Sequence, residues 1–236
     1  MALLLVVVAR MSFVIFFLPG IGEQTIPAQA RLLVLLAISF ALATTGVIDQ
    51  PPPGYAAYGA TLIGEATIGF CLGVTLRVVI WMLSIAGTVI SQSIGLSQLL
   101  GVAMEHESQA MVGNMLSMAG AALLLSADFH LNAIASLLRM YGDIPVGAVG
   151  ALDQGMLVEA LTSAVGFAVL LAWPFVAINL LYNICLGFIN KALPSLMVAF
   201  VGAPMMIGAG LLLLALSVTG LLVVWKDRVM AVVGWM

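Results

Sequence analysis

The residues best suited to chemistry are few, and none of them forms a recognisable catalytic or metal-binding set. Glu105, His106 and Glu107 carry suitable ligand atoms, but adjacent residues on a helix point about 100° apart and do not converge on one ion. We interpret this segment as a solvated loop. Asp143 lies beside Pro145, and no second aspartate lies within a hydrophobic run. A turn is therefore favoured over an intramembrane aspartyl protease.

The chain also lacks the short signatures of common enzymes. It has no G-x-x-x-x-G-K-[ST] phosphate loop, no H-E-x-x-H zinc helix and no G-x-S-x-G nucleophile elbow. Cys71 and Cys185 both lie in apolar runs and form no C-x-x-C pair. His130, near Asp128, is interpreted as a hydrogen-bonded structural histidine. We predict that the chain is not an enzyme and has no catalytic residue, cofactor or metal ion.

Two ionisable residues, Glu65 and Arg77, lie inside one long apolar run. Ions in lipid are costly, so they are usually paired or functional. Because the two are 12 residues apart, they face about 120° away from each other on a helix. We predict that each is a buried polar or subunit-interface residue, with its partner on another helix or another chain.

Three asparagines, Asn179, Asn183 and Asn190, are spaced 4 and 7 apart, which places them on one helix face. Buried amides in an apolar helix need hydrogen-bond partners. They could bond across a helix interface or line a polar path, and we favour the interface.

A methionine series begins within the most polar stretch of the chain, residues 91–114, and continues beyond it. Met104, Met111, Met115 and Met118 are spaced 7, 4 and 3 apart, which is one helix face from Met111 onward. A packed core face is the plainer interpretation. The alternative is a deformable seal, because methionine is flexible and fits many shapes.

Small residues form a further face, with Ser84, Gly87, Ser91 and Gly95 at helical spacing. Gly69 and Gly73 add a G-x-x-x-G pattern. Such faces allow close helix packing in membranes. Ordinary glycine content of membrane helices explains the pattern equally well.

The composition indicates a membrane protein. Of the 236 residues, 64% are hydrophobic and 7% charged, against about 25% charged in soluble domains. Seven basic residues against ten acidic ones also exclude a nucleic-acid binder, which needs a basic patch. No strand pattern is present, so the fold class is an all-α membrane protein. The predicted apolar runs are 1–18, 32–47, 55–94, 115–127, 157–188 and 195–224.

The run 55–94 is too long for a simple span. It holds no proline, and as one helix it would be about 60 Å long, twice the hydrocarbon thickness. It is either one very long helix or two helices with a hidden break. A single helix of this length would not be simply immersed in lipid.

Several motifs in a shared order resemble the FliR/SctT family of export-gate proteins from bacterial flagella and type III secretion systems. Near the start, Arg10 and the segment 19–31 match its R…P…P…R pattern. Residues 64–73 resemble its E-x-x-x-G-x-x-x-G, and 94–97 its MGLS segment, in the form IGLS, which leans toward the flagellar branch. Residues 144–147 resemble its LPIG. Residues 190–204 resemble its N-[RK]-x-x-P-x-[LM]…G-x-P pattern.

This resemblance implies a fold of long helices and helical hairpins that assembles helically with partner subunits into a closed cone, partly raised out of the bilayer. Residues 1–154 would be a FliP-like part with a plug loop at about 95–110, and 155–236 a FliQ-like hairpin. The family often has Asp-Pro after MGLS where this chain has Glu105-His106, so the resemblance does not carry over the exact geometry of this loop.

The resemblance also implies a function. The chain would be a single-copy subunit that helps to form and seal the pore for unfolded export substrates. Its partners would be FliP-like, FliQ-like and FlhB-like membrane subunits and lipid, in the bacterial inner membrane at the flagellar basal body or injectisome base. The expected plug and gate residues are Leu99, Leu100, Gly101, Val102, Ala103, Met104, Met111, Met115 and Met118.

Two other functions are consistent with the residues. A stand-alone transporter of a small solute would use intramembrane charges and broken helices near the membrane midplane, but the sequence shows no inverted repeat. A passive scaffold would use the polar loop only as a connector.

Overall fold

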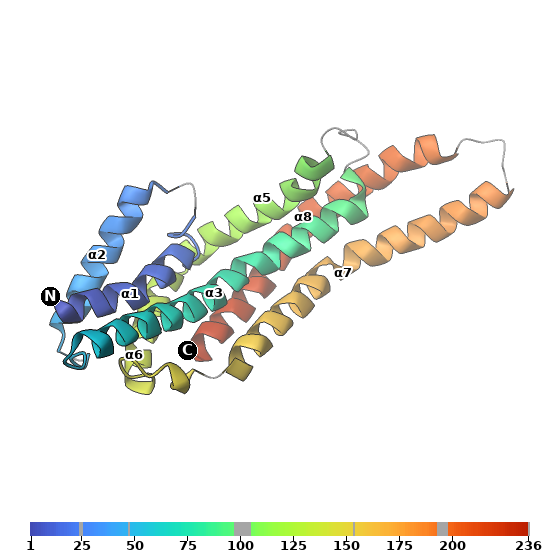
Figure 1. The fold of residues 1–236 in the computed structure, drawn as a ribbon. Coiled ribbons are helices and arrows are strands. Elements are labelled where there is room, and N and C mark those ends of the chain that lie inside the picture. Colours follow the sequence, from blue (N-terminus) through green and yellow to red (C-terminus); the bar gives the residue numbers. More distant parts are fainter. Residues whose placement is uncertain (24–25, 47, 97–104, 153, 193–197, 236) are drawn as a thin grey trace. The chain divides into compact units, whose positions relative to one another are not determined.

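The computed structural model describes residues 1–23, 26–46, 48–96, 105–152, 154–192 and 198–235. Within these ranges the chain is helical, as predicted, and contains no strand. Figure 1 shows that long helices make up most of the described chain. The N-terminal helices are α1 (Ala2–Phe17) and α2 (Ala28–Thr44), and α3 spans Tyr55–Ile94. The others are α5 (Glu105–Ser126), α6 (Phe129–Asp143), the short 3-10 helix η2 (Val149–Ala151), α7 (Gln154–Ala192) and α8 (Val198–Trp235).

Helix α3 decides between the two interpretations of its run. It is one continuous helix of 40 residues, because its sequence contains no proline and no cluster of turn residues. It begins after Pro51, Pro52, Pro53 and Gly54, and Gly54 adopts φ +110°. The prolines remove backbone donors and stop any earlier helix, while glycine permits the left-handed conformation.

One predicted loop is helical instead. Glu105, His106 and Glu107 begin α5 rather than forming a solvated loop. Residues 105–112 contain no proline or glycine. The helix formed by the following apolar segment can therefore extend back to Glu105.

Helices α5 and α6 meet at a bend of 70°. Asp128, between them, adopts φ 53°, the left-handed conformation that aspartate tolerates better than most residues. The neighbouring His130 differs from its prediction, since its buried Nδ1 has no hydrogen-bond partner among the described residues.

In the part of the chain that the structure describes, three helical segments are long and apolar enough to cross a membrane: Tyr55–Ile94, Leu157–Ala192 and Gly202–Ala231. The bent pair Met111–Ser126 and Phe129–Asp143 would add a fourth if it forms one span. These lengths and compositions agree with the predicted all-α membrane class.

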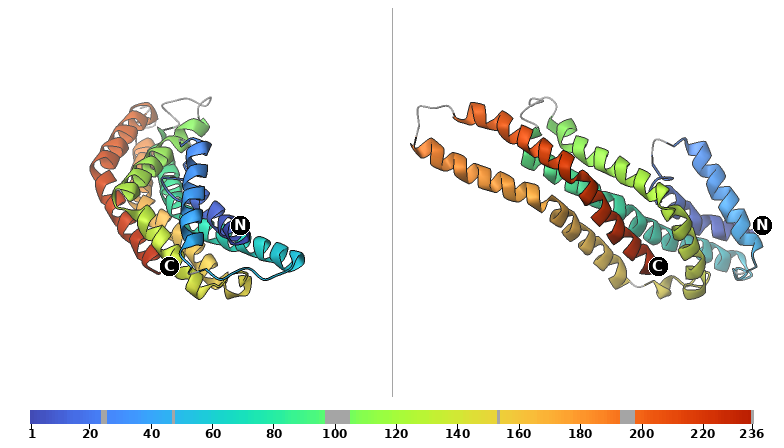
Figure 2. Two further views of the ribbon diagram at one scale, coloured as in Figure 1. Left: turned by 90° about the vertical axis from the view of Figure 1, so that its left-hand side faces the viewer. Right: turned by 180° about the vertical axis from the view of Figure 1, so that it is seen from behind.

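The chain divides into two compact units. Unit 1 comprises residues 1–80, 121–162 and 228–236, and unit 2 comprises 81–120 and 163–227. In unit 1, α1 packs against α2, and fully buried apolar side chains of α1 and α3 form much of the core, among them Val6, Met11, Ile68 and Leu72. In unit 2 the buried side chains include Leu83, Ile90, Ala172, Phe175 and Trp225. Within unit 2, α7 and α8 run in opposite directions (Figure 2).

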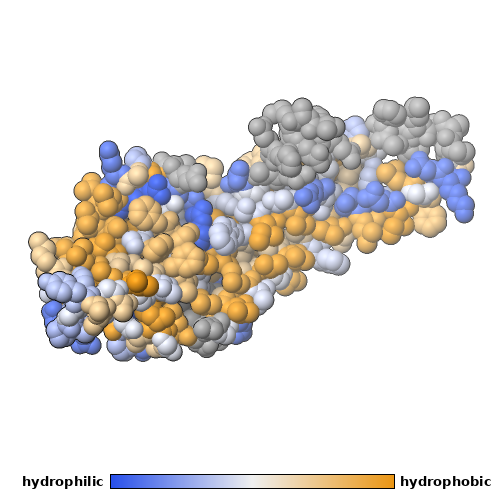
Figure 3. Space-filling model, viewed as in Figure 1, coloured by the Kyte–Doolittle hydropathy of each residue, from blue (hydrophilic) through white to orange (hydrophobic). Residues whose placement is uncertain are grey.

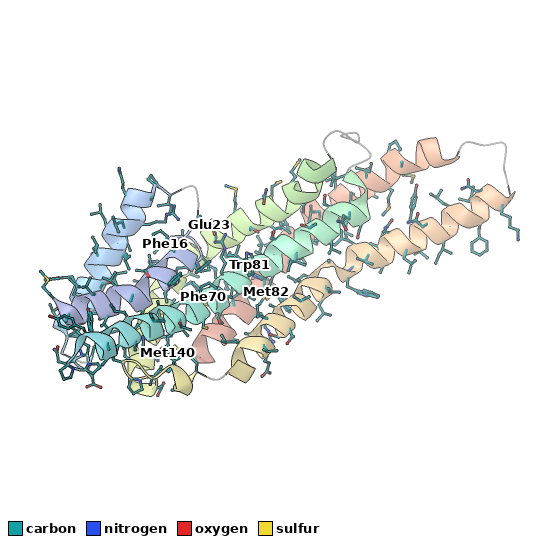
Figure 4. The ribbon with its side chains drawn as sticks, viewed as in Figure 1. Phe16, Glu23, Phe70, Trp81, Met82 and Met140 are labelled. Carbon is teal, nitrogen blue, oxygen red and sulfur yellow. The ribbon has the colours of Figure 1, made fainter. Side chains whose placement is uncertain are left out.

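Glycines allow α1 and α3 to lie unusually close together in unit 1. A Cβ on Gly69 would overlap the carbonyl oxygen of Arg10, and one on Gly73 would lie 2.8 Å from the carbonyl oxygen of Phe13. Phe70, between these glycines, makes edge-to-face contacts with Phe13 and Phe17. Figure 4 shows Phe70 on α3 where the helix runs beside α1. The G-x-x-x-G pattern is therefore a packing site within the chain.

Gly69→Ala should destabilise the chain because α1 and α3 would have to move apart. We expect a loss of about 1–3 kcal/mol, typical of overpacking, seen as a lower unfolding midpoint in detergent. Gly59→Ala is the matched control on the same helix, since nothing lies within 4 Å of a Cβ there. Equal midpoints for the two variants would contradict the close approach of α1 and α3.

Candidate functional site: a buried ion pair and exposed helix faces

Among the charged residues whose burial the structure describes, the two most buried form one ion pair in unit 1. Arg10 on α1 and Glu65 on α3 are 1% and 0% exposed. Arg10 Nε donates to Glu65 Oε2 at 2.6 Å, and Arg10 Nη2 donates to Glu65 Oε1 at 2.9 Å. This two-bond geometry is the strongest form of an arginine–carboxylate pair.

The same pair also binds the connection between α6 and α7. Both terminal nitrogens of Arg10 donate to the carbonyl oxygen of Ile144, at 3.2 and 3.1 Å. Glu65 Oε1 also accepts the backbone N–H of Gly147 at 2.9 Å. The guanidinium lies 4.0 Å from the ring centre of Tyr141, a cation–π contact. One ion pair thus joins three separate parts of the sequence.

Arg77 is paired in the same unit with a residue that precedes α2. Arg77 Nη1 donates to Glu23 Oε1 at 2.7 Å, and the two side chains are 22% and 27% exposed. Figure 4 shows Glu23 beyond the C-terminal end of α1, near Phe16. Glu65 and Arg77 therefore do not pair with each other, and each has its partner on another segment of the same chain.

Sequence reasoning did not identify the partners Arg10 and Glu23. Arg10 was visible as a lone charge inside the first apolar run and as part of the family pattern. Its spacing to Glu65 gave no signal because they lie 55 residues apart. The backbone contacts to Ile144 and Gly147 had no sequence signal beyond the 144–147 motif.

Helix α5 packs tightly against α3 in unit 2. A Cβ on Gly87 would lie 2.5 Å from Cα of Gly113, and one on Gly113 would lie 2.8 Å from the carbonyl oxygen of Ser84. The predicted small-residue face of α3 therefore makes at least part of its contacts within the chain.

The opposite side of α5 carries the predicted methionines. Met111, Met115 and Met118 are 41%, 66% and 66% exposed, while Val112 and Leu116 are buried. The methionines are thus not a packed core face of this chain. Met104 and the other predicted plug residues, 99–103, lie outside the described residues.

The asparagines of α7 also face outward in unit 2. Asn183 and Asn190 are exposed, and Asn179 is half-buried. Asn183 Nδ2 donates to both the backbone oxygen and Oδ1 of Asn179, at 2.8 Å each. Around them Leu180, Leu181 and Phe188 are 60–71% exposed.

In the described part of the chain, no group of three His, Cys, Asp or Glu side chains is placed to hold a metal ion. The arrangement combines ion pairs within the chain with large exposed helix faces. Figure 3 shows one such largely hydrophobic surface, with hydrophilic patches on it. These features suit a protein that binds other helices.

Comparison with known proteins identifies the family. Residues 1–232 match the family model described as bacterial export proteins, family 1. A flagellar biosynthetic protein FliR from Caulobacter vibrioides is 34% identical over 228 residues, covering 94% of this chain and 90% of the relative. FliR proteins of Escherichia coli and Aquifex aeolicus are 24% and 25% identical, covering 84% and 88% of this chain and 77% and 82% of their own length.

Removing one member of the Arg10–Glu65 pair should be far worse than removing both. Arg10→Met or Glu65→Met leaves an unpaired buried charge and should cost about 3–5 kcal/mol, whereas the double variant should recover much of this loss. The measurement is the unfolding midpoint in detergent. Arg77→Met, in the half-exposed pair, is the control and should cost about 1 kcal/mol or less. If the double variant lost as much stability as the two single variants together, Arg10 and Glu65 would not be energetically coupled.

Proposed function

The chain belongs to family 1 of the bacterial export proteins, and from that premise we propose that it is a subunit of a flagellar protein export gate. The relatives it matches over most of their length are flagellar biosynthetic proteins named FliR. The gate role rests on the family resemblance together with the exposed helix faces. The chain would help to form and seal a pore for unfolded export substrates, as one copy in a larger assembly.

The observation that carries this proposal is the low burial of the last two spans. The apolar windows of Leu157–Ala192 and Gly202–Ala231 are 28% and 11% buried within the chain, against 61% for α3. Their length, about 45–55 Å at the rise of an α-helix, exceeds the hydrocarbon thickness. Lipid alone would not cover them, so partner helices are expected to do so.

The proposed role of each part of the chain follows the family resemblance. Residues 1–154 would act as a FliP-like part and 155–236 as a FliQ-like hairpin, packed against FliP-like, FliQ-like and FlhB-like subunits in the inner membrane. Catalysis is not expected of this chain, and energy for export would enter through partners. The family match does not support the stand-alone solute transporter.

The proposed seal combines two neighbouring segments. Residues 99–104 would plug the pore, and the exposed methionine face of α5 (Met111, Met115 and Met118) would line or support the plug. A flexible thioether side chain adapts to many neighbours, which suits a pore that closes on itself and opens around an unfolded chain.

Replacing residues 99–104 by a Gly-Ser linker should make the membrane leaky to small ions, because the apolar plug is lost. The measurement is ion permeability in cells that make the complete gate, with secretion of flagellar proteins assayed beside it. Unchanged permeability and unchanged export would sink the plug assignment.

The methionine face is tested by two triple variants at Met111, Met115 and Met118. Changing all three to alanine should increase ion leakage, since the apolar bulk is removed, whereas changing all three to leucine should largely preserve the seal. Because these side chains are exposed in the chain, both variants should unfold near the wild-type midpoint. Equal leakage from the alanine variant and wild type would exclude a sealing role.

A further inference from the structure

One edge of α7 carries polar groups that the chain itself leaves largely unused. Asn179, Asn183, Gly187 and Asn190, the amide stripe, are spaced 4, 4 and 3 apart. At about 100° per residue they fall within roughly 80° of one another around the helix. We propose that the amide stripe binds a neighbouring transmembrane helix through uncharged hydrogen bonds. This inference rests on the proposed function, because it specifies the chemistry of one partner subunit.

The stripe has spare hydrogen-bonding capacity. Asn183 Nδ2 is used within the chain, by the backbone oxygen and Oδ1 of Asn179. Nδ2 of Asn179, Oδ1 of Asn183 and the whole carboxamide of Asn190 have no partner among the described residues. An amide facing lipid without partners costs several kcal/mol. Lipid is therefore a poor cover for this edge.

The chemistry of the span favours an uncharged partner. Between Glu159 and Lys191 the sequence of α7 contains no charged residue. A charged side chain on the partner would find no counter-ion along this length, which is costly in a membrane. Serine, threonine, asparagine or glutamine side chains on the partner would satisfy the amides, as they do between membrane helices.

Gly187 provides room for a close approach. Nothing lies within 4 Å of a Cβ built on it, so the helix surface is open at this position. The contact of α7 with α8 uses other residues, since Tyr182 and Leu186 lie against Gly202. The amide stripe lies beside this contact and remains open, which leaves it for a helix from another subunit.

Two variants test the proposal through recovery of the partner subunits with the tagged chain in mild detergent. The double change Asn179→Leu and Asn183→Leu removes the hydrogen bonds, and Gly187→Leu blocks the approach. Each should lower recovery of at least one partner by about tenfold. Asn183→Gln keeps the amide and should recover better than Asn183→Leu.

The matched control for Gly187→Leu is Gly166→Leu on the same helix. Gly166 is exposed, and nothing lies within 4 Å of its Cβ position, but it lies outside the stripe, 13 residues before Asn179 and about 60° from Gly187 around the helix. This variant should recover partners like the wild type. Wild-type recovery from both stripe variants would overturn the inference, as would equal losses from Gly166→Leu and Gly187→Leu. Failure of the wild-type chain to recover any partner would instead overturn the proposed function.

Discussion

The Arg10–Glu65 ion pair is the interaction on which the N-terminal half depends. In a chain with so few charges, each buried charge must be compensated locally, because neither water nor lipid can do so. Glu65 receives three donors and Arg10 also binds the carbonyl oxygen of Ile144. The pair therefore fixes α1 on α3 and holds the connection that leads toward α7. The close glycine contact at Gly69 makes this geometry possible, since α1 passes directly over it.

Unit 2 differs from unit 1 in that much of its apolar surface stays uncovered within the chain. Its helices pack through small contacts such as Gly87 on Gly113, yet they leave large apolar side chains outside. Leu216 is 76% exposed and Met205 74%. In a membrane such side chains are covered by lipid or by neighbouring helices, and the length of the two spans is the physical basis for proposing partners at these faces.

Much of the fold could be predicted from sequence because its signals are local. The main helices follow from the apolar runs. The three prolines before α3 mark its start, and the absence of any break in 55–94 allows it to continue. The start of α5 was misjudged because polar residues such as Glu105 and His106 suggest a loop although their helix propensity is adequate. Spacing placed Asn179 and Asn183 on one face, and the structure shows them bonded to each other.

Pairings over long sequence distances, such as Arg10 with Glu65 or Glu23 with Arg77, have no local signal. Burial could not be predicted from the sequence either. A helix face that is exposed in the single chain but covered in an assembly has the same apolar sequence pattern as a face buried in the chain's own core.

The exposed helix faces lead us to propose that this chain completes its fold as one member of a hetero-oligomeric membrane complex. Native mass spectrometry tests it most directly, on tagged chain purified in mild detergent from cells that also make the neighbouring export proteins. We expect a complex with one copy of this chain and several copies of two other small membrane proteins. A free monomer or a homodimer, with those neighbours demonstrably present in the membrane, would contradict it.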